Sequence, residues 1–562
     1  MTKTISEVLE SSGYNNKDQK WVTYRIERLP LSFQSKVEAD YVKLAESDSF
    51  REANSLIREL YEEIRLKGTS LLATCSNDAI KQYAEIISKR LETDFGDFMR
   101  RTGNKDFSIQ RIVSEVETRG LTFPLERCFE CTDAERIAAL ARVFNPRWWV
   151  RRLRKIKNFK LELIARRLEM VHKRGQVYCS NMSVSNRREQ KQRNTRMIEG
   201  LEAVSDEGDV LSLAECVEAS VANPENRRAE LMVRMRGFED VANDAGHQGV
   251  FFTLTAPSKY HAVHASGKPN NKYQGATPKE TNNYLGNLWT KVRSAWDRRG
   301  IKPYGFRVVE PHHDGTPHWH LMLFFEPTQC SEAIEKFRDY AIAEDRAELR
   351  NNLAARFDTK MIDPKKGSAT GYIAKYISKN INGYGVDLDH ESGTDAQDSA
   401  VRVDAWAALF GIRQFQQIGG PQVSIWRELR RVSEKEAREW FHKSDEQQPE
   451  SIKQARSAAD ASNWKAYVTL MGGPSCKRKD QALQLHKVIR RTECGLKEEN
   501  DYGEIISRVR GVIDRIKGNA AMLLTRAKRW SVRRAEHDSE PQVSPWSSVN
   551  NCTREFKSVN VG

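Results

Sequence analysis

Apolar residues in the first 170 positions recur mainly at helical spacing. The segment 49–66 shows this pattern, with apolar side chains on one helical face at Leu56, Ile57, Leu60 and Ile64. A stripe of this kind predicts an amphipathic helix that buries one side. We therefore expect residues 1–170 to form a helical N-terminal domain.

The end of this region, 145–157, sets aromatic residues among cations, and two interpretations of it remain open. Cations bind phosphates and aromatic rings stack on bases, which favours a contact with nucleic acid. The candidate contact residues are Arg147, Trp148, Arg151 and Arg152. Alternatively, the segment is an amphipathic helix that buries its tryptophans behind a solvated basic face.

The pattern changes near residue 246. Residues 249–255 form a β-rich apolar run that stops at Pro257, and a loop over 259–275 follows. The chain then predicts a helix over 278–299, a hairpin of strands over 304–310 and 318–325, and helices over 331–350 and 370–380. This order is typical of an α+β domain, 246–400, with helices on one face of its sheet.

The regions around this domain have weaker patterns. Residues 171–245 are polar and rich in Arg and Asn, which indicates a basic helical connector. Residues 401–535 are expected to be helical and basic, and 536–562 to be a disordered tail. The fold class that follows is α+β, with a sheet domain flanked by mostly helical N- and C-terminal regions.

Charge and composition narrow the choice of partners. The 562 residues carry a formal net charge of +14, which suits nucleic acid, although an acidic membrane surface remains an alternative. No apolar run reaches the roughly 18 residues of a membrane span, and residues 1–10 lack the apolar stretch of a signal peptide. Nine cysteines, an odd number, indicate free thiols in a reducing compartment. We expect a cytoplasmic protein that binds no membrane.

The sequence His318-Trp-His320 lies on the second strand of the predicted hairpin. Side chains on a strand alternate between its faces, so the two histidines point the same way and Trp319 points the other way. Two imidazoles on one face can bind a single divalent metal ion. The alternative is a pair of exposed strand histidines without a ligand.

Glu310 favours the metal interpretation. It ends the preceding strand, across the hairpin from the histidines. Two histidines and a carboxylate suit Mg²⁺ or Mn²⁺ and leave positions open for a phosphate oxygen. His312, His313 and Asp314 are alternative ligands, but they lie in the connecting turn, which is a less rigid support, so Glu310 is favoured.

A second motif occupies 371–379, Gly-Tyr-Ile-Ala-Lys-Tyr-Ile-Ser-Lys. Tyr372 and Tyr376 are four residues apart and share one face of a helix, with Lys375 and Lys379 beside that face. A phenol hydroxyl can attack phosphorus, and a cation such as Lys375 can stabilise the charge that develops. Lys379 is also a candidate for contact with DNA. The alternative is ordinary packing of tyrosines on an amphipathic helix.

Together these residues resemble the HUH endonuclease superfamily, where U is a bulky apolar residue. The closer similarity is to the replication gene A proteins of tailed phages. The segments 251–257 (Phe-Phe-Thr-Leu-Thr-Ala-Pro), 310–324 (which contains His-Trp-His) and 371–380 are similar to the three motifs of that family. The stretch 406–420 is also similar, but it suggests no chemistry.

The resemblance implies a central antiparallel sheet, with the His-Trp-His strand in the middle and the tyrosine helix packed near it. It implies that His318 and His320 bind metal, with Glu310 as the third ligand. One tyrosine would cleave a single strand at the replication origin and stay joined to the 5′ phosphate. The freed 3′ hydroxyl would prime rolling-circle synthesis, and the second tyrosine would then release a circle.

The implied partner is origin DNA, either single-stranded or supercoiled duplex. No GxxxxGK[ST] motif occurs in the chain. A host helicase is therefore expected to unwind the duplex, and a host polymerase to extend the primer. Further phosphate contacts are expected in 147–157 and 507–534, which are basic.

Three alternatives remain. A relaxase or transposase would share the chemistry, but relaxases have three histidines and an N-terminal tyrosine, and single-tyrosine transposases are shorter. A non-catalytic DNA-binding regulator would have lost a ligand or a tyrosine, and none is missing here. A metal-dependent nuclease without a covalent step would need clustered carboxylates, whereas this hairpin offers mainly histidines.

Overall fold

The computed structural model describes residues 4–47, 49–125, 130–264, 266–385, 388–389, 394–443, 447–491, 494–515 and 521–535. The expected tail, 536–562, lies outside them. The chain forms two compact units. The first consists of Met1–Val171, Ser180–Ser183 and Ile489–Ile506, and the second of His172–Cys179, Val184–Val488 and Ser507–Gly562.

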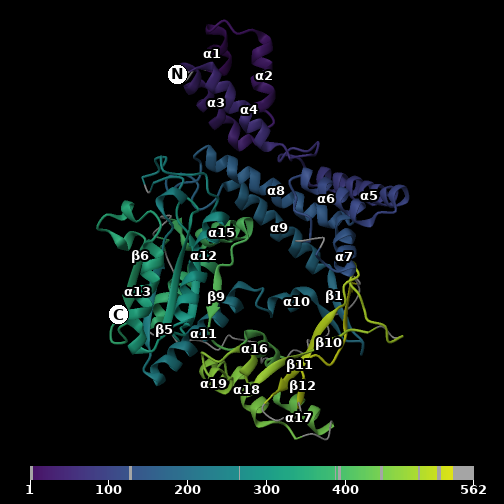
Figure 1. Ribbon diagram of the computed structural model, residues 1–562, viewed down its shortest axis with the longest axis vertical. Helices are drawn as coiled ribbons and strands as arrows, with labels where there is room; N and C mark the ends of the chain where they lie inside the picture. The colour runs from purple at the N-terminus through teal and green to yellow at the C-terminus, as the bar shows by residue number, and fades with distance from the viewer. Residues whose placement is uncertain are drawn as a thin grey trace. The chain divides into compact units, whose positions relative to one another are not determined.

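The first unit is built from helices packed around one apolar core (Figure 1). Its helices are α1 (Ile5–Ser11), α2 (Asn16–Ile26), α3 (Leu31–Ser47), α4 (Phe50–Ile64), α5 (Asn77–Thr102), α6 (Lys105–Thr118), α7 (Asp133–Val143) and α8 (Pro146–Arg167). Helix α4 confirms the stripe predicted over 49–66: Ile57, Leu60 and Ile64 are buried, and the Ser49 side chain caps the helix.

The second unit contains a five-stranded sheet in the order β6-β3-β5-β4-β9, and every neighbouring pair is antiparallel. The strands are β3 (Gln248–Leu254), β4 (Tyr304–Pro311), β5 (Pro317–Phe325), β6 (Phe357–Met361) and β9 (Phe415–Ile418). The His-Trp-His strand, β5, is the central one, as expected. The sequence did not indicate β6 and β9, because both are short edge strands with mainly polar residues.

Helices cover both faces of this sheet, so the expectation of helices on one face was wrong. Helices α11 (Pro224–Ala245) and α14 (Ala369–Ile381) pack on the face that carries His318 and His320. Helices α12 (Pro278–Asp297) and α13 (Pro327–Ile342) pack on the other, where Phe337 contacts Phe252 at 5.3 Å between ring centroids. The cause is that β4 and β5 are buried along their whole length, so both faces need an apolar cover.

The remaining elements correct two further expectations. The helix predicted over 331–350 begins earlier, at Pro327, and ends at Ile342, and Asp345 and Arg350 beyond it have left-handed φ values of 50° and 47°. The region 401–535 is mostly helical as far as Leu470, apart from the short strand β9, and strands follow. Only part of their sequence alternates apolar and polar residues, as in Leu-Gln-Leu-His at the start of β10, a pattern that favours β-structure.

The other helices and strands of the second unit are α9 (Asn181–Glu199), β1 (Leu201–Ser205), β2 (Val210–Ser212), α10 (Leu213–Glu218), β7 (Leu388–Asp389), β8 (Thr394–Asp395), α15 (Ala396–Phe410), α16 (Val423–Leu429), α17 (Glu434–Lys443), α18 (Glu450–Asp460), α19 (Trp464–Leu470), β10 (Leu483–Ile489), β11 (Ser507–Asp514), β12 (Met522–Leu524) and β13 (Trp530–Arg534). The expected connector, 171–245, thus includes a short antiparallel pair, β1 with β2. No helix in the described ranges has both the length and the apolar character that a membrane crossing requires.

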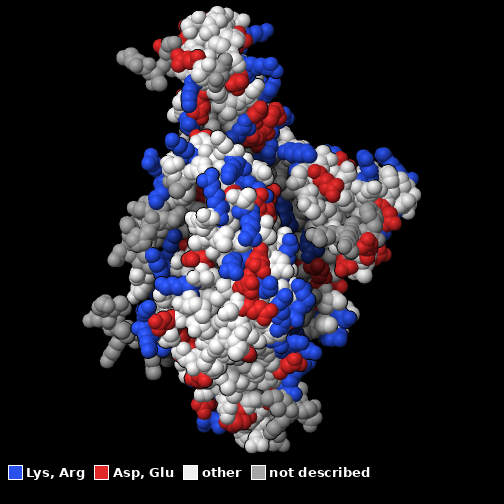
Figure 2. Space-filling view, turned by 60° about the vertical axis from the view of Figure 1, so that its left-hand side comes forward, with Lys and Arg blue, Asp and Glu red and all other residues white. Residues whose placement is uncertain are grey.

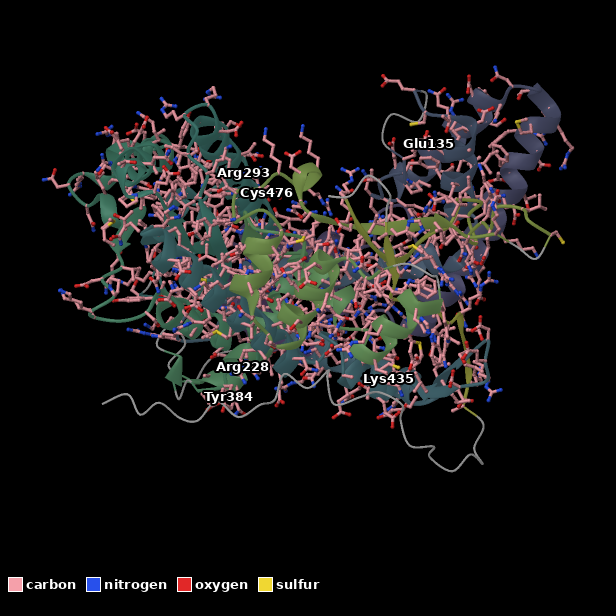
Figure 3. The ribbon with its side chains drawn as sticks, turned by 90° about the horizontal axis from the view of Figure 1, so that it is seen from below. Glu135, Arg228, Arg293, Tyr384, Lys435 and Cys476 are labelled. Carbon is pink, nitrogen blue, oxygen red and sulfur yellow. The ribbon has the colours of Figure 1, made fainter. Side chains whose placement is uncertain are left out.

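Helix α14, which carries both tyrosines, is fixed at each end. At its start, the buried Glu239 carboxylate of α11 accepts hydrogen bonds from the Ala369 and Thr370 amides at 2.7 and 3.2 Å, and from the Thr370 hydroxyl at 2.6 Å. An anion is favourable at this end because of the helix dipole. Beyond its end, the Arg228 guanidinium of α11 lies 3.9 Å from the ring centroid of Tyr384 (Figure 3).

The Glu239 anchor predicts a stability effect. Glu239→Ala leaves two amides and a hydroxyl without their acceptor inside the protein. We expect the free energy of unfolding of the second unit to fall by about 2–4 kcal/mol, measured by urea denaturation of the full chain. Asp240→Ala is the matched control, since among the described residues Asp240 pairs with the exposed Arg236 alone, on the same helix, and it should cost less than about 0.5 kcal/mol. Equal effects of the two substitutions would contradict the anchoring role.

Candidate active site

His318, His320 and Glu310 form one buried group on the α14 face of the sheet. Their potential ligand atoms all lie within 4.8 Å of one another. The Nε2 atoms of the two histidines are 2.9 Å apart, and His320 Nε2 is 3.8 Å from Glu310 Oε2. Glu310 stands directly opposite His318 in the β4–β5 pair. The structure therefore brings together the three residues that the hairpin pattern predicts.

Burial holds the two imidazoles in the neutral form, which is the form that binds metal. Burial, together with smaller contributions from His312 and Lys379, lowers the pKa of His320 to about 3. Burial also holds the pKa of His318 well below its usual value, with contributions from His312 and then His320. Two neutral imidazoles and a carboxylate are a donor set that fits a divalent ion.

Neighbouring side chains fix the orientation of this group. The Thr253 hydroxyl of β3 lies 3.2 Å from His320 Nδ1, which leaves Nε2 facing the other two ligands. The Asn380 amide of α14 donates to Glu310 Oε1 and, at 2.6 Å, to the Tyr376 carbonyl. The His318 ring stacks on His312 with centroids 4.0 Å apart. Thr253 and Asn380 thus connect the ligands to both neighbouring elements.

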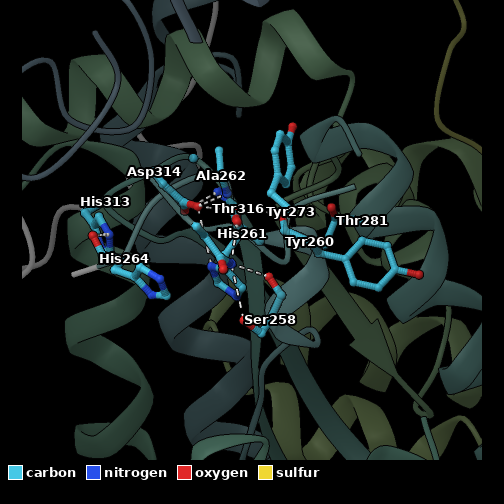
Figure 4. A network of polar contacts seen from close by, with 12 residues as sticks. Ser258, Tyr260, His261, Ala262, His264, Tyr273, Thr281, His313, Asp314 and Thr316 are labelled. Atoms are coloured by element: carbon cyan, nitrogen blue, oxygen red, sulfur yellow. Dashed lines mark hydrogen bonds and ion pairs between the residues drawn. The ribbon is translucent and has the colours of Figure 1, made fainter. Parts of the chain in front are cut away.

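The alternative carboxylate, Asp314, is engaged elsewhere (Figure 4). It is fully buried and accepts hydrogen bonds from the Ala262 amide at 3.1 Å and from the Thr316 amide and hydroxyl at 2.9 and 2.8 Å. His313 Nε2 lies 3.3 Å from the His264 carbonyl oxygen. These contacts connect the 259–275 loop to the hairpin turn. The hydrogen bonds of Asp314 therefore hold this loop, and Asp314 is not part of the His-His-Glu group.

The two tyrosines of α14 have different surroundings. The ring of Tyr376 lies 4.0 Å from that of His320 and 5.4 Å from that of Phe251, measured between centroids. Burial raises the pKa of Tyr376, Glu310 raises it further, and Lys379 opposes both. Tyr372 lies one turn earlier, with its ring 6.4 Å from Phe251. On another side of the same helix, Ile373 and Ile377 are fully buried against the sheet.

The two lysines of the tyrosine motif lie in different environments. Lys379 is buried, with Nζ 3.5 Å from Glu310 Oε2, so it lies inside the site, away from the surface where a DNA contact was expected. Lys375 is exposed on α14. A third lysine, Lys360 of β6, has its Nζ 4.5 Å from the ring centroid of Tyr372.

The candidate DNA-contact residues of the first unit also differ in exposure. Trp148 is buried in the helical core beside Trp149, with ring centroids 5.1 Å apart. Its ring is therefore not exposed for stacking on a base, because the apolar face of the amphipathic α8 faces inward. Arg147, Arg151 and Arg152 are exposed on the outer face of α8.

Several residues at this site were missed by the sequence interpretation. Thr253 belongs to the Phe-Thr-Leu-Thr motif and pairs with His320 in the β3–β5 register, so the period-two pattern contained a signal. Asn380 follows Tyr376 by four residues, which places both on one helical face. Lys360 had no signal, because β6 was not predicted.

A family model for the bacteriophage replication gene A protein matches residues 119–384, which include the whole site. The replication gene A protein of Escherichia phage 186 is 43% identical over 436 residues, which is 75% of this chain and 60% of that protein. The probable replication protein P12 of Pseudoalteromonas phage PM2 is 38% identical over 430 residues, or 75% of this chain and 63% of that protein. The chain thus spans under two thirds of the length of these two relatives.

One relative is covered more completely. The probable replication endonuclease from a prophage-like region of Salmonella paratyphi A is 30% identical over 572 residues, which is 96% of this chain and 68% of that protein. No solved structure matches the chain. From the family model and these relatives, the chain belongs to the bacteriophage replication gene A protein family.

Proposed function

We propose that this protein is a site-specific single-strand DNA endonuclease that nicks a replication origin and starts rolling-circle replication. The main support is the position of Tyr376, whose ring lies 4.0 Å from that of His320 in the His-His-Glu group. A phenol nucleophile and a metal-binding group are side by side. The relatives named replication gene A protein and replication endonuclease agree with this function.

His318, His320 and Glu310 would hold a Mg²⁺ or Mn²⁺ ion. When bound, such an ion polarises the scissile phosphate. Burial keeps the two histidines neutral, and Thr253 and Asn380 orient His320 and Glu310. Lys379 places a positive charge beside Glu310 and Tyr376, where it favours the phenolate that attack requires.

The reaction is a transesterification. The tyrosine hydroxyl oxygen forms a bond to phosphorus and loses its proton, the bond from phosphorus to the 3′ oxygen breaks, and that oxygen takes up a proton. The product is a 5′-phosphotyrosine link with a free 3′ hydroxyl. Two tyrosines on one helix allow a second transfer that releases a circle. A host helicase and polymerase in the bacterial cytoplasm would supply unwinding and synthesis.

Substitution of the tyrosines tests the covalent step. Supercoiled DNA that carries the cognate replicon is incubated with the full chain and Mg²⁺ or EDTA, and 5′ adducts are measured by gel. We expect an Mg²⁺-dependent adduct with the unaltered chain and with at least one of Tyr372→Phe and Tyr376→Phe, and none with the double variant. Nicking that survives in the double variant would point to hydrolysis by water. No nicking at all would favour a DNA-binding regulator.

Metal affinity tests the ligand group without requiring activity. Free Mn²⁺ is measured by electron paramagnetic resonance during titration of the full chain. We expect His320→Ala to abolish binding at this site and Thr253→Val to weaken it about 10- to 100-fold, because the valine cannot orient the imidazole. Thr359→Val on the opposite face of the sheet is the control, and it should leave the affinity unchanged. Retained binding in His320→Ala would place the ion elsewhere.

We also propose that the outer face of α8 contacts DNA. The net charge alone does not locate such a surface, since Lys and Arg form several groups interspersed with Asp and Glu on the face shown in Figure 2. On α8, Arg147, Arg151 and Lys155 follow one outward stripe, and none has an acidic partner within the described ranges. Arg147 and Arg151 also line a cleft of about 590 Å³, together with Tyr502.

The salt dependence of binding tests this stripe. Each phosphate contact with single-stranded DNA contributes about 0.7 to the slope of log affinity against log salt concentration. Replacing Arg147, Arg151 and Lys155 by Gln should reduce the slope by about 2 in fluorescence anisotropy with a single-stranded oligonucleotide. The control replaces Lys17, Lys20 and Arg101, which are exposed elsewhere on the first unit. Equal changes in both triple variants would mean that only total charge matters.

A further inference from the structure

Edge strand β6 contributes a side chain to the active-site face. In the antiparallel pair of β3 and β6, Lys360 stands opposite Phe251. Opposed residues of a sheet share a face, and the Phe251 ring stacks on the rings of His320 and Tyr376, with centroids 5.5 and 5.4 Å away. Lys360 therefore lies on the same face as the His-His-Glu group, at the open edge of the sheet.

The Lys360 ammonium is associated with Tyr372. Its Nζ is 4.5 Å from the Tyr372 ring centroid. The side chain is exposed, and no ion pair joins it to an acidic residue within the described ranges. Asp358, two residues earlier, shares its face and is also exposed, so the edge carries one charge of each sign. A lysine that lies over a tyrosine ring and forms no ion pair remains positively charged, so it can still bind an anionic ligand.

Each tyrosine therefore has its own cation. Lys379 is buried beside Glu310, and it acts on the environment of Tyr376. Lys360 comes from a different element and lies at Tyr372 on the outer side of the site. The exposed Lys375 has no recorded contact with either ring within the described ranges. The side chains therefore do not place one shared cation beside both tyrosines.

We propose that Lys360 binds the phosphodiester that Tyr372 attacks, as a second phosphate position at the rim of the site. This inference rests on the proposed endonuclease function. The Tyr372 oxygen forms a bond to phosphorus and loses its proton, the bond to the 3′ oxygen breaks, and that oxygen is protonated. Negative charge on the non-bridging oxygens grows during this step, and the Lys360 ammonium stabilises it. Tyr376 reacts without help from Lys360.

The test makes each tyrosine the sole nucleophile in turn. Lys360→Gln is introduced into the full chain with Tyr376→Phe, which keeps Tyr372, and into the full chain with Tyr372→Phe, which keeps Tyr376. The substrate is a single-stranded oligonucleotide that contains the cognate nick site. The rate of 5′ adduct formation is measured under single-turnover conditions across substrate concentrations. Lys360→Arg tests rescue by a second cation, and Lys365→Gln removes an exposed lysine from the neighbouring turn as a control.

We expect Lys360→Gln to slow adduct formation at least about tenfold through Tyr372 and less than about threefold through Tyr376. Lys360→Arg should restore most of the rate through Tyr372, and Lys365→Gln should change neither rate. A loss of similar size in both backgrounds, or no loss in either, would overturn the proposal. An adduct through Tyr376 with none through Tyr372 would also overturn it. If neither background forms an adduct while Lys360 is intact, the proposed function itself fails.

Discussion

The whole site depends on the register of two strands. In the β4–β5 pair, Glu310 stands opposite His318 and Val308 stands opposite His320, so the carboxylate and both imidazoles share one face. A slip of one residue would turn every side chain of β5 over and put Trp319 in place of the histidines. The register is strongly specified, because both faces of β5 are buried and each has its own set of partners. The helices that cover both faces of the sheet therefore stabilise the fold and also help to fix the geometry of the His-His-Glu group.

The second constraint is the position of α14. The sheet carries the His-His-Glu group, but the tyrosines lie beside it only because their helix has the right position along its axis and the right rotation about it. Glu239 fixes the position of α14 along its axis by accepting hydrogen bonds from the first amides of the helix. Ile373 and Ile377 fix the rotation of α14 about that axis by packing on the sheet. Asn380 then joins the helix to Glu310 directly. These contacts are ordinary packing and capping interactions, so chemistry in this protein is held in place by the same forces that fold it.

Sequence periodicity predicted the parts of this site that lie on long, regular elements. The alternation in β5 placed His318 and His320 on one face, the hairpin placed Glu310 across from them, and the spacing of four put Tyr372 and Tyr376 on one side of a helix. It did not predict contributions from outside those elements. Edge strand β6 is too short and too polar to stand out, so Lys360 could not be connected with Tyr372. Trp148 is a case in which a sequence pattern was visible but ambiguous. An amphipathic basic helix and a DNA-stacking segment have the same pattern, and only the burial of the tryptophan in the core distinguishes them. The strands after Leu470 were missed because their alternation is incomplete: β10 alternates only over its first four residues, and β12 is Met-Leu-Leu.

The proposed two-tyrosine mechanism raises a geometric question, because Tyr372 and Tyr376 lie on adjacent turns of one helix. Residues four apart on a helix have Cβ atoms about 5–6 Å from each other, so the two tyrosines would approach a phosphate beside the His-His-Glu group from different turns of α14. The helix itself is fixed at its start by Glu239 and near its end by the hydrogen bond from Asn380 to Glu310. In the proposed reaction, two phosphate positions along one face of the sheet would let the DNA strand shift between the tyrosines while α14 keeps its place. The buried Lys379 near Tyr376 and the exposed Lys360 over Tyr372 agree with such a shift, since each would lie beside one of the two phosphate positions.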